Sequence, residues 1–345
     1  MRILLGMSGG IDSTYAAVRL MREGHTVEGA TLIMHEHTEL EASRSAARSL
    51  GIPLHEIDCR EPFARIVQSN FVEEYKNART PNPCIICNSE IKFRFLLDYA
   101  LANGFERIAT GHYGKVVARD FESGVRYALK FAEDKRKDQS YMLWRLPQKV
   151  LEKLLLPLSD MTKESVRKDA KESDIIAADR ADSQEICFLP DGDYPSFIEE
   201  RSGGIKMGNF VDECGRIIAP HKGIVHYTVG QRRGLGISAS SRIFVKEIDP
   251  VSGDVVLSPN DPHATRVKLS GVVYSGIAPK DEAFEMKLSV KLRYAAPPVM
   301  ATVKFFGTEA EVLLDSPHRA VTPGQSCVIY DNDILVAGGF IDSAT

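Results

Sequence analysis

Apolar residues in the first half of the chain follow two patterns that alternate along the sequence. Short apolar runs predict buried strands at residues 3–5, 27–33, 54–57 and 107–110. Between them, apolar residues that recur every three or four positions predict helices at residues 12–22, 39–50, 62–75 and 89–103. Strands that alternate with helices predict an α/β fold, in which a doubly wound parallel sheet carries helices on both faces.

The pattern changes after residue 202. Helical periodicity fades, and stretches such as residues 287–293 and 301–305 alternate apolar and polar side chains. Clusters of turn-forming residues, such as 249–253 and 331–333, separate these stretches. This pattern predicts short antiparallel strands that form one or two small barrels.

Composition places the chain among multidomain globular proteins. Of its 345 residues, 43% are hydrophobic and 26% are charged, and no apolar run is long enough to span a membrane. We expect a cytosolic protein, because the apolar start of the chain is too short for a signal peptide. Thiols stay reduced there, so the six cysteines indicate catalysis or metal binding before disulfides. A net charge of −4 argues against a nonspecific nucleic-acid binder but leaves room for a local basic face.

The stretch Ser-Gly-Gly-Ile-Asp-Ser at residues 8–13 lies between the first predicted strand and the first helix. Backbone N–H groups, hydroxyls and a helix N-terminus that meet there suit a phosphate or pyrophosphate better than a plain turn. The stretch matches neither the Walker A loop nor the dinucleotide fingerprint. It resembles the loop of the ATP pyrophosphatases, which cleave ATP to AMP and pyrophosphate and adenylate a carbonyl oxygen. In such a site Mg²⁺ neutralises the pyrophosphate, and Asp12 is the candidate ligand, directly or through water.

Further motifs select one family of these enzymes. In chain order they are TPNPCIICN (80–88), IKF (91–93), ATGHY (109–113), KDQSYML (137–143), DSQEICF (182–188), GQRRGLG (230–236), LRY (292–294) and TPGQS (322–326). This ordered set resembles the tRNA-specific 2-thiouridylase (MnmA) family over nearly the whole chain. Each motif alone is modest support, whereas the ordered set is specific.

The resemblance implies a reaction and an architecture. ATP adenylates O2 of the wobble uridine in the tRNAs for lysine, glutamate and glutamine, a sulfur atom attacks C2, and AMP leaves 2-thiouridine behind. The partners are tRNA and a sulfur donor, such as a cysteine desulfurase or a persulfide relay protein. The implied parts are a catalytic domain with an inserted tRNA-binding region (1–202), a central β domain (203–267) and a C-terminal β-barrel (268–345).

The resemblance also implies residue roles. The ATP site comprises Gly6, Met7, Ser8, Gly9, Gly10, Ile11, Asp12, Ser13, Met34 and Gly111. The pocket for the target base, which must leave its stack, comprises Asn82, Pro83 and Cys84. Contacts to tRNA are implied for His112, Lys137, Asp138, Gln139, Arg293, Tyr294 and Gln325. Taken alone, the histidine would be a hydrogen-bonded loop residue, and the charged residues a solvated turn and a strand end.

Two cysteines carry the sulfur chemistry that the resemblance implies. Cys87 corresponds to the nucleophile and Cys187 to the persulfide carrier, and both act as thiolates. In that scheme the terminal sulfur on Cys187 attacks the adenylated C2, and Cys87 releases the product by forming a disulfide.

The chain departs from the family at Cys84, where many members have aspartate. Cys84, Cys87 and Cys187 would together suit a [4Fe–4S] cluster with one iron left open to bind hydrosulfide. A structural zinc would need a fourth ligand, and none is strongly placed. The persulfide and cluster mechanisms therefore both remain open at the level of sequence.

Two other functions are weighed against thiolation. An ATP pyrophosphatase with a nitrogen nucleophile, such as an amide synthetase, would use the same loop, but the chain shows no glutaminase-like domain. A noncatalytic RNA-binding protein would need neither the intact loop at residues 8–13 nor the three cysteines.

Overall fold

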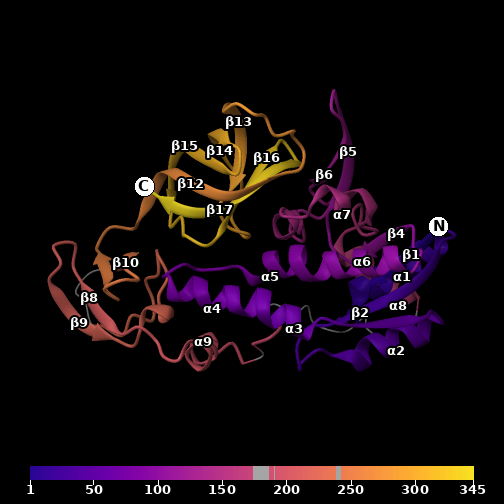
Figure 1. The fold of residues 1–345 in the computed structure, drawn as a ribbon, viewed down its shortest axis with the longest axis horizontal. Coiled ribbons are helices and arrows are strands. Elements are labelled where there is room, and N and C mark those ends of the chain that lie inside the picture. The colour runs from indigo at the N-terminus through magenta and orange to yellow at the C-terminus, as the bar shows by residue number, and fades with distance from the viewer. Residues whose placement is uncertain (174–185, 190, 238–241) are drawn as a thin grey trace.

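The computed structural model describes residues 1–173, 186–189, 191–237 and 242–345. Figure 1 shows the parallel sheet with its helices at one end, a small sheet at the other end, and a barrel beside the helices that connect them. Within these residues no helix is both long and apolar enough to cross a membrane.

The N-terminal domain is built on a five-stranded parallel sheet in the order β3-β2-β1-β4-β7. Its strands are β1 (Arg2–Gly6), β2 (Thr26–Ile33), β3 (Leu54–Asp58), β4 (Arg107–Thr110) and β7 (Leu154–Leu155). Successive residues of β1 enter different cores: Leu4 packs with α6 (Phe93–Ala102) and α7 (Gln148–Lys153), whereas Ile3 and Leu5 pack on the other face. That other face is covered by α1 (Ile11–Arg22), α2 (Leu40–Leu50) and α8 (Lys163–Glu172). The predicted doubly wound α/β fold is confirmed.

The helices between β3 and β4 differ from the prediction. They are α3 (Arg60–Phe63), the π-helix η1 (Ala64–Gln68), α4 (Ser69–Lys76), α5 (Pro83–Ile86), the π-helix η2 (Cys87–Lys92) and α6. The helix predicted to start at Ser89 starts at Pro83, because the Asn82 side chain accepts a hydrogen bond from the Cys84 N–H and proline suits the first helical position. Ser89 lies inside η2 and caps no helix.

A hairpin that sequence reasoning missed follows β4. Strands β5 (Lys115–Phe121) and β6 (Gly124–Lys130) pair with each other, and β6 joins the sheet of the barrel through Lys130 and Ile334. The hairpin projects from the catalytic domain beside the barrel (Figure 1). The chain then passes through the 3₁₀-helix η3 (Ser140–Leu143) and reaches α7, β7 and α8; α9 (Tyr194–Ser202) comes later.

The second half is built of β-strands, as predicted. The central sheet has the order β10-β11-β8-β9, with β8 (Gly208–Val211), β9 (Ile217–His221), the short 3₁₀-helix η5 (Ile224–His226), β10 (Phe244–Ile248) and β11 (Val255–Ser258). The C-terminal strands are β12 (His263–Tyr274), β13 (Phe284–Lys291), β14 (Val299–Phe306), β15 (Glu309–Arg319), β16 (Ser326–Asp331) and β17 (Ile334–Ala344). Pairing of β12 with both β15 and β17 closes these six antiparallel strands into a barrel.

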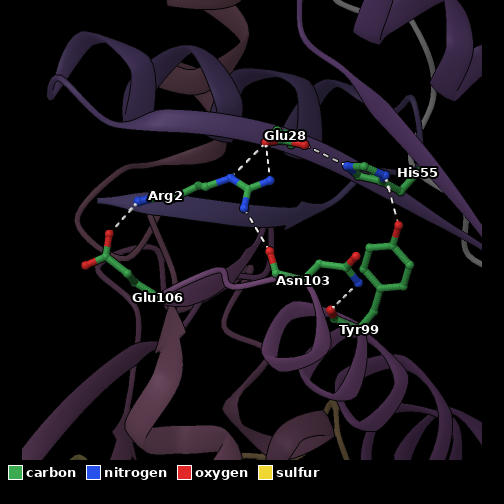
Figure 2. A network of polar contacts seen from close by, with 6 residues as sticks. All are labelled: Arg2, Glu28, His55, Tyr99, Asn103 and Glu106. Carbon is green, nitrogen blue, oxygen red and sulfur yellow. Dashed lines mark hydrogen bonds and ion pairs between the residues drawn. The ribbon is translucent and has the colours of Figure 1, made fainter.

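A polar network ties the strands of the parallel sheet to α6 (Figure 2). Glu28 on β2 accepts hydrogen bonds from the Arg2 guanidinium at 2.9 Å and lies 2.7 Å from Nε2 of His55 on β3. The other ring nitrogen of His55 lies 3.0 Å from the Tyr99 hydroxyl on α6. Because Glu28 is largely shielded from water, this network fixes the register of three strands against the helix that continues from η2.

Candidate active site

The loop after β1 has the geometry of an anion cradle. Gly9 has φ of +73°, and a Cβ there would lie 2.3 Å from the backbone of Ala42, so only glycine fits. The Ser8 N–H donates to Oγ of Ser13, and Oγ of Ser13 donates to the Gly10 carbonyl. These bonds fold the loop back onto the first turn of α1, whose N-terminus favours negative charge.

Asp12 is held by Tyr113, the last residue of the ATGHY motif, and by Lys163, which the sequence did not single out. The Tyr113 hydroxyl donates to Oδ1 at 2.8 Å, and the Lys163 ammonium donates to Oδ2 at 2.6 Å. Lys163 reaches the loop because the Thr162 side chain caps α8 and the Lys163 N–H donates to Asp134. A direct magnesium bond to Asp12 therefore competes with Lys163. The signal for Lys163 was its position as the first residue of a helix with an N-cap threonine.

Gly111 lies against the same loop, and His112, which follows it, packs on Phe93. A Cβ on Gly111 would come within 2.7 Å of the backbone of Asp12 and Ser13, so this glycine lets β4 pack closely on α1. Burial and the Lys92 charge lower the pKa of His112 to about 3. The imidazole is therefore neutral at physiological pH, and it hydrogen-bonds with the Thr110 hydroxyl at 2.9 Å. It supplies no positive charge to a phosphate.

The three cysteines lie within electrostatic reach of one another. Cys84 on α5 and Cys187 are exposed, whereas Cys87 at the start of η2 is only 4% exposed. The Cys87 thiol donates to Sδ of Met34 at 3.6 Å, which places it against the end of β2. Met34 is a predicted ATP contact, and this hydrogen bond places the Cys87 thiol beside that predicted position. Residues 182–185 of the motif that contains Cys187 lie outside the described residues.

Lys92 is the cation of this thiol site, and sequence reasoning missed it. In an α-helix, residues five apart point to different sides, but the π-helical turn from Cys87 to Lys92 brings them closer to one face. Burial alone would lower the pKa of Lys92, yet the thiols of Cys87, Cys84 and Cys187 raise it above its ordinary value. The IKF motif contained Lys92, but a π-helix leaves no clear signal in sequence.

The thiols differ in their readiness to ionise. Burial raises the pKa of Cys87 to about 12, and Lys92 acts against that rise. Desolvation by the surrounding protein also raises the pKa of Cys187, although this residue is exposed. Cys87 is therefore protected as a thiol, while Cys187 is open to a partner.

The thiols do not fit a preassembled metal cluster. Across the described residues, no three side chains of histidine, cysteine, aspartate or glutamate converge into a group that could hold a metal ion. Cys87 is also turned toward Met34. We therefore route no chemistry through an iron–sulfur cluster.

The side chains of Asn82 and Asn88 both donate hydrogen bonds to Met142. The Asn82 amide donates to Sδ of Met142 at 3.4 Å, and the Asn88 amide donates to the Met142 carbonyl at 3.0 Å. The Asn88 side-chain oxygen is buried and has no hydrogen-bond partner within the described structure. Pro83 is also buried. Asn88 was not predicted, and an unsatisfied buried acceptor becomes visible only in three dimensions.

Several residues predicted to contact tRNA also make hydrogen bonds within the protein. The Asp138 carboxylate is buried, accepts from the Ala132 N–H and from Ser140, and has a raised pKa because of burial. Gln139 accepts a hydrogen bond from the Tyr113 N–H at 2.9 Å and so supports the loop beside Asp12. Arg293 donates to the Ala320 carbonyl and to the Thr322 hydroxyl, and the Gln325 amide donates to the Thr80 carbonyl.

Tyr294 is partly exposed, and its hydroxyl donates to the Asp138 carbonyl at 3.2 Å. It lines a cavity of about 470 Å³ between the 131–138 segment and the barrel, together with Lys135, Arg136 and Lys291. Lys137 precedes the buried Asp138 and is partly exposed. Cations beside an aromatic ring and an open cavity are features of a surface that receives RNA.

Family models match three successive parts of the chain. Residues 1–191 match the tRNA methyl transferase HUP domain, residues 196–259 the tRNA methyl transferase PRC-barrel domain, and residues 265–341 the aminomethyltransferase β-barrel domain. The fold and the site thus define a three-domain protein of the class built on a tRNA-modifying HUP domain.

Full-length relatives identify the family within this class. The chain is 40% identical to the tRNA-specific 2-thiouridylase MnmA of Acetivibrio thermocellus, over 99% of both chains. It is also 40% identical to that of Carboxydothermus hydrogenoformans, over 99% of this chain and 97% of the relative. The chain belongs to the tRNA-specific 2-thiouridylase family, a family of tRNA-uridine 2-sulfurtransferases, which confirms the resemblance seen in the sequence.

Among solved structures, a 4-thiouridine synthetase in complex with RNA and ATP matches with a TM-score of 0.37 and 16% identity. The match covers 58% of this chain and 50% of that chain. A likeness this distant says nothing about function.

Proposed function

We propose that the protein uses ATP to convert the wobble uridine of the tRNAs for lysine, glutamate and glutamine to 2-thiouridine. The observation that supports this proposal most strongly is that the thiol cluster lies beside the predicted ATP site. The Met34 sulfur beside the predicted adenine position accepts a hydrogen bond from Cys87, and Cys87 interacts with Cys84, Cys187 and Lys92. A nucleotide cradle that adjoins a cluster of thiols suits activation of a base followed by sulfur transfer.

In the first step, O2 of the uridine attacks the α-phosphorus of ATP, and the bond to pyrophosphate breaks. The loop at residues 8–13 and the N-terminus of α1 hold the phosphates, and Lys163 offers a positive charge beside them. Mg²⁺ bound to ATP would neutralise the pyrophosphate as it leaves.

In the second step, sulfur moves from Cys187. The terminal sulfur of a Cys187 persulfide attacks C2, the bond from C2 to the AMP oxygen breaks, and AMP leaves. The Cys87 thiolate then attacks Sγ of Cys187, which breaks the persulfide S–S bond and releases 2-thiouridine. The resulting disulfide takes two electrons from a thiol reductant, and a persulfide donor protein reloads Cys187.

The exposure of the thiols supports these roles. Exposed Cys187 is open to a donor such as a cysteine desulfurase or a persulfide relay protein, whereas buried Cys87 is shielded from it. Lys92 would stabilise the anionic sulfur at each stage. Cys84 has no step of its own in this scheme. We further propose that Lys137 and Tyr294 contact tRNA and that the reaction takes place in the cytoplasm, where tRNA is used.

Pyrophosphate release tests the proposal against its alternatives. Release from ATP that tRNA stimulates favours thiolation. Release that needs ammonia and a carboxylate substrate would instead indicate an amide synthetase. An absence of release under both conditions, with tRNA still bound, would indicate a noncatalytic RNA-binding protein.

A further inference from the structure

We infer that Gln325 on the barrel is a positioning residue for the cysteine segment, so that the C-terminal barrel completes the sulfur-transfer site of the catalytic domain. This inference rests on the proposed function, because it assigns a purpose to the placement of Asn82, Cys84 and Cys87. It differs from the tRNA contact that the family resemblance implies for Gln325.

Both backbone polar groups of Thr80 are hydrogen-bonded to the barrel. The Thr80 N–H donates to the Pro323 carbonyl at 2.9 Å, and the Gln325 amide donates to the Thr80 carbonyl at 2.7 Å. The central domain adds a third contact, because the hydroxyls of Thr80 and Thr228 lie 3.2 Å apart. Thr80 is thus the point at which all three domains meet.

Neighbouring bonds make this junction stiff. Arg79 donates to Glu74 at 2.8 Å and to the carbonyl of Ile341 on β17 at 3.1 Å. Gly324 has φ of +88°, and a Cβ there would lie 2.8 Å from the Thr80 nitrogen. The barrel turn therefore approaches the segment so closely that a side chain at residue 324 would push it away.

The segment of chain that links Thr80 to the thiols is short and rigid. Pro81 and Pro83 flank Asn82, and each proline fixes its own φ and restricts the residue before it. The Asn82 side chain then caps α5 at the Cys84 N–H, and η2 with Cys87 follows directly. If Thr80 moves, Asn82 and Cys84 should therefore move with it.

The same part of the barrel also binds the segment at residues 141–144, which lies against Asn82 and Asn88. The Trp144 ring N–H donates to the Ser326 hydroxyl at 3.0 Å, and the Tyr141 hydroxyl donates to the Ser326 carbonyl at 2.8 Å. Tyr141 lies on η3 beside Met142, which accepts the hydrogen bonds of Asn82 and Asn88. One barrel turn thus aligns both segments between which the uracil would enter.

The test compares four proteins: wild type, Gln325→Ala, Gly324→Ala and Gly307→Ala. Gly307 is the matched control, because it has a positive φ of +63° on the same barrel but faces open space. Three quantities are measured: the single-turnover rate of 2-thiouridine formation at saturating tRNA, the Kd for tRNA, and hydrogen exchange of the amides at residues 79–88 in the protein alone.

A positioning role predicts that Gln325→Ala and Gly324→Ala lower the saturating rate by about tenfold to a hundredfold. The Kd for tRNA should stay within about twofold, amide exchange at residues 79–88 should speed up, and Gly307→Ala should behave as wild type. A higher Kd with an unchanged saturating rate would overturn the inference and make Gln325 a direct RNA contact. Unchanged exchange in Gln325→Ala would also overturn it. If wild type forms no 2-thiouridine, the proposed function fails, and the exchange data still decide whether the barrel holds the segment.

Discussion

Replacing Lys92 with methionine should make Cys87 react more slowly with an alkylating reagent. Burial raises the pKa of Cys87 to about 12 from an ordinary value of 9.0, and Lys92 is the neighbouring group that lowers it. Methionine has a flexible unbranched side chain of similar length but no charge. The pKa of Cys87 should therefore rise further in Lys92→Met.

The size of the effect follows from the thiolate population. Only the thiolate reacts, so a pKa of about 12 instead of 9.0 leaves about one thousandth of the ordinary thiolate at pH 8. Because ionisation increases with pH, the rate should still climb about tenfold per pH unit between about pH 8 and 10. An opposite charge close to an ionising group typically shifts its pKa by about one unit or more, and one unit is worth about 1.4 kcal/mol. Loss of Lys92 should therefore slow the reaction of Cys87 at least about tenfold.

Pulsed alkylation with iodoacetamide, followed by mass spectrometry of the peptide that contains Cys87, measures this rate. The peptide with exposed Cys214 serves as an internal reference, and Lys149→Met on the exposed side of α7 is the control variant. Two results would refute the reasoning: a Cys87 rate in wild type that equals the Cys214 rate and levels off below pH 10, or a Lys92→Met rate no lower than that of wild type.

Three further predictions concern other parts of the molecule. Lys163→Met should weaken ATP binding about tenfold in calorimetry, because it leaves the Asp12 carboxylate uncompensated beside the phosphates; exposed Lys168→Met on the same helix should not, and equal affinities would contradict the assignment. Cys84→Ser should keep 2-thiouridine formation within about threefold of wild type when a persulfide donor is supplied; a collapse of activity would give Cys84 a role in the chemistry. Glu28→Gln should lower the free energy of unfolding by about 1–3 kcal/mol at pH 7 in urea titrations, since it removes the charged acceptor of Arg2 and His55. The pKa of Glu28 is lowered in the folded state, so the full difference is expected above its ordinary value of 4.5 and should shrink as pH falls below it; a constant difference in acid would count against this network.

Much of the fold was readable from the chain because its signals are local. The apolar runs of β1 to β4, and the glycines that end the helices, appear where periodicity predicted them. The start of α5 was missed because the Asn82 cap and Pro83 lie in the same stretch as Cys84 and Cys87, which was interpreted as a thiol motif and not as a helix start. The β5–β6 hairpin was missed although its strands pair locally, from Lys115–Lys130 to Phe121–Gly124. Only its link to β17, through Lys130 and Ile334 some two hundred residues later, leaves no local signal.

Some residues of the candidate site could be predicted from local motifs, and others could not. The loop at residues 8–13 and the cysteines carry motif signals, so the sequence was enough to nominate them. Lys92 lies in the IKF motif, but it joins the site through a π-helix that the motif does not reveal. Lys163 lies in no motif and joins the site because α8 packs on α1. The internal bonds of Asp138, Arg293 and Gln325 were also hidden, because resemblance assigns a position to a function without showing what the side chain touches.

The central claim is that sulfur passes from Cys187 to the uridine and that Cys87 completes the release. A single turnover with protein preloaded with persulfide, ATP and unmodified tRNA tests it most directly, with mass spectrometry of both the tRNA nucleosides and the protein. Our account predicts one 2-thiouridine for each Cys87–Cys187 disulfide formed, and neither product in Cys187→Ser. Formation of 2-thiouridine by Cys187→Ser, or by wild type without the disulfide, would contradict it.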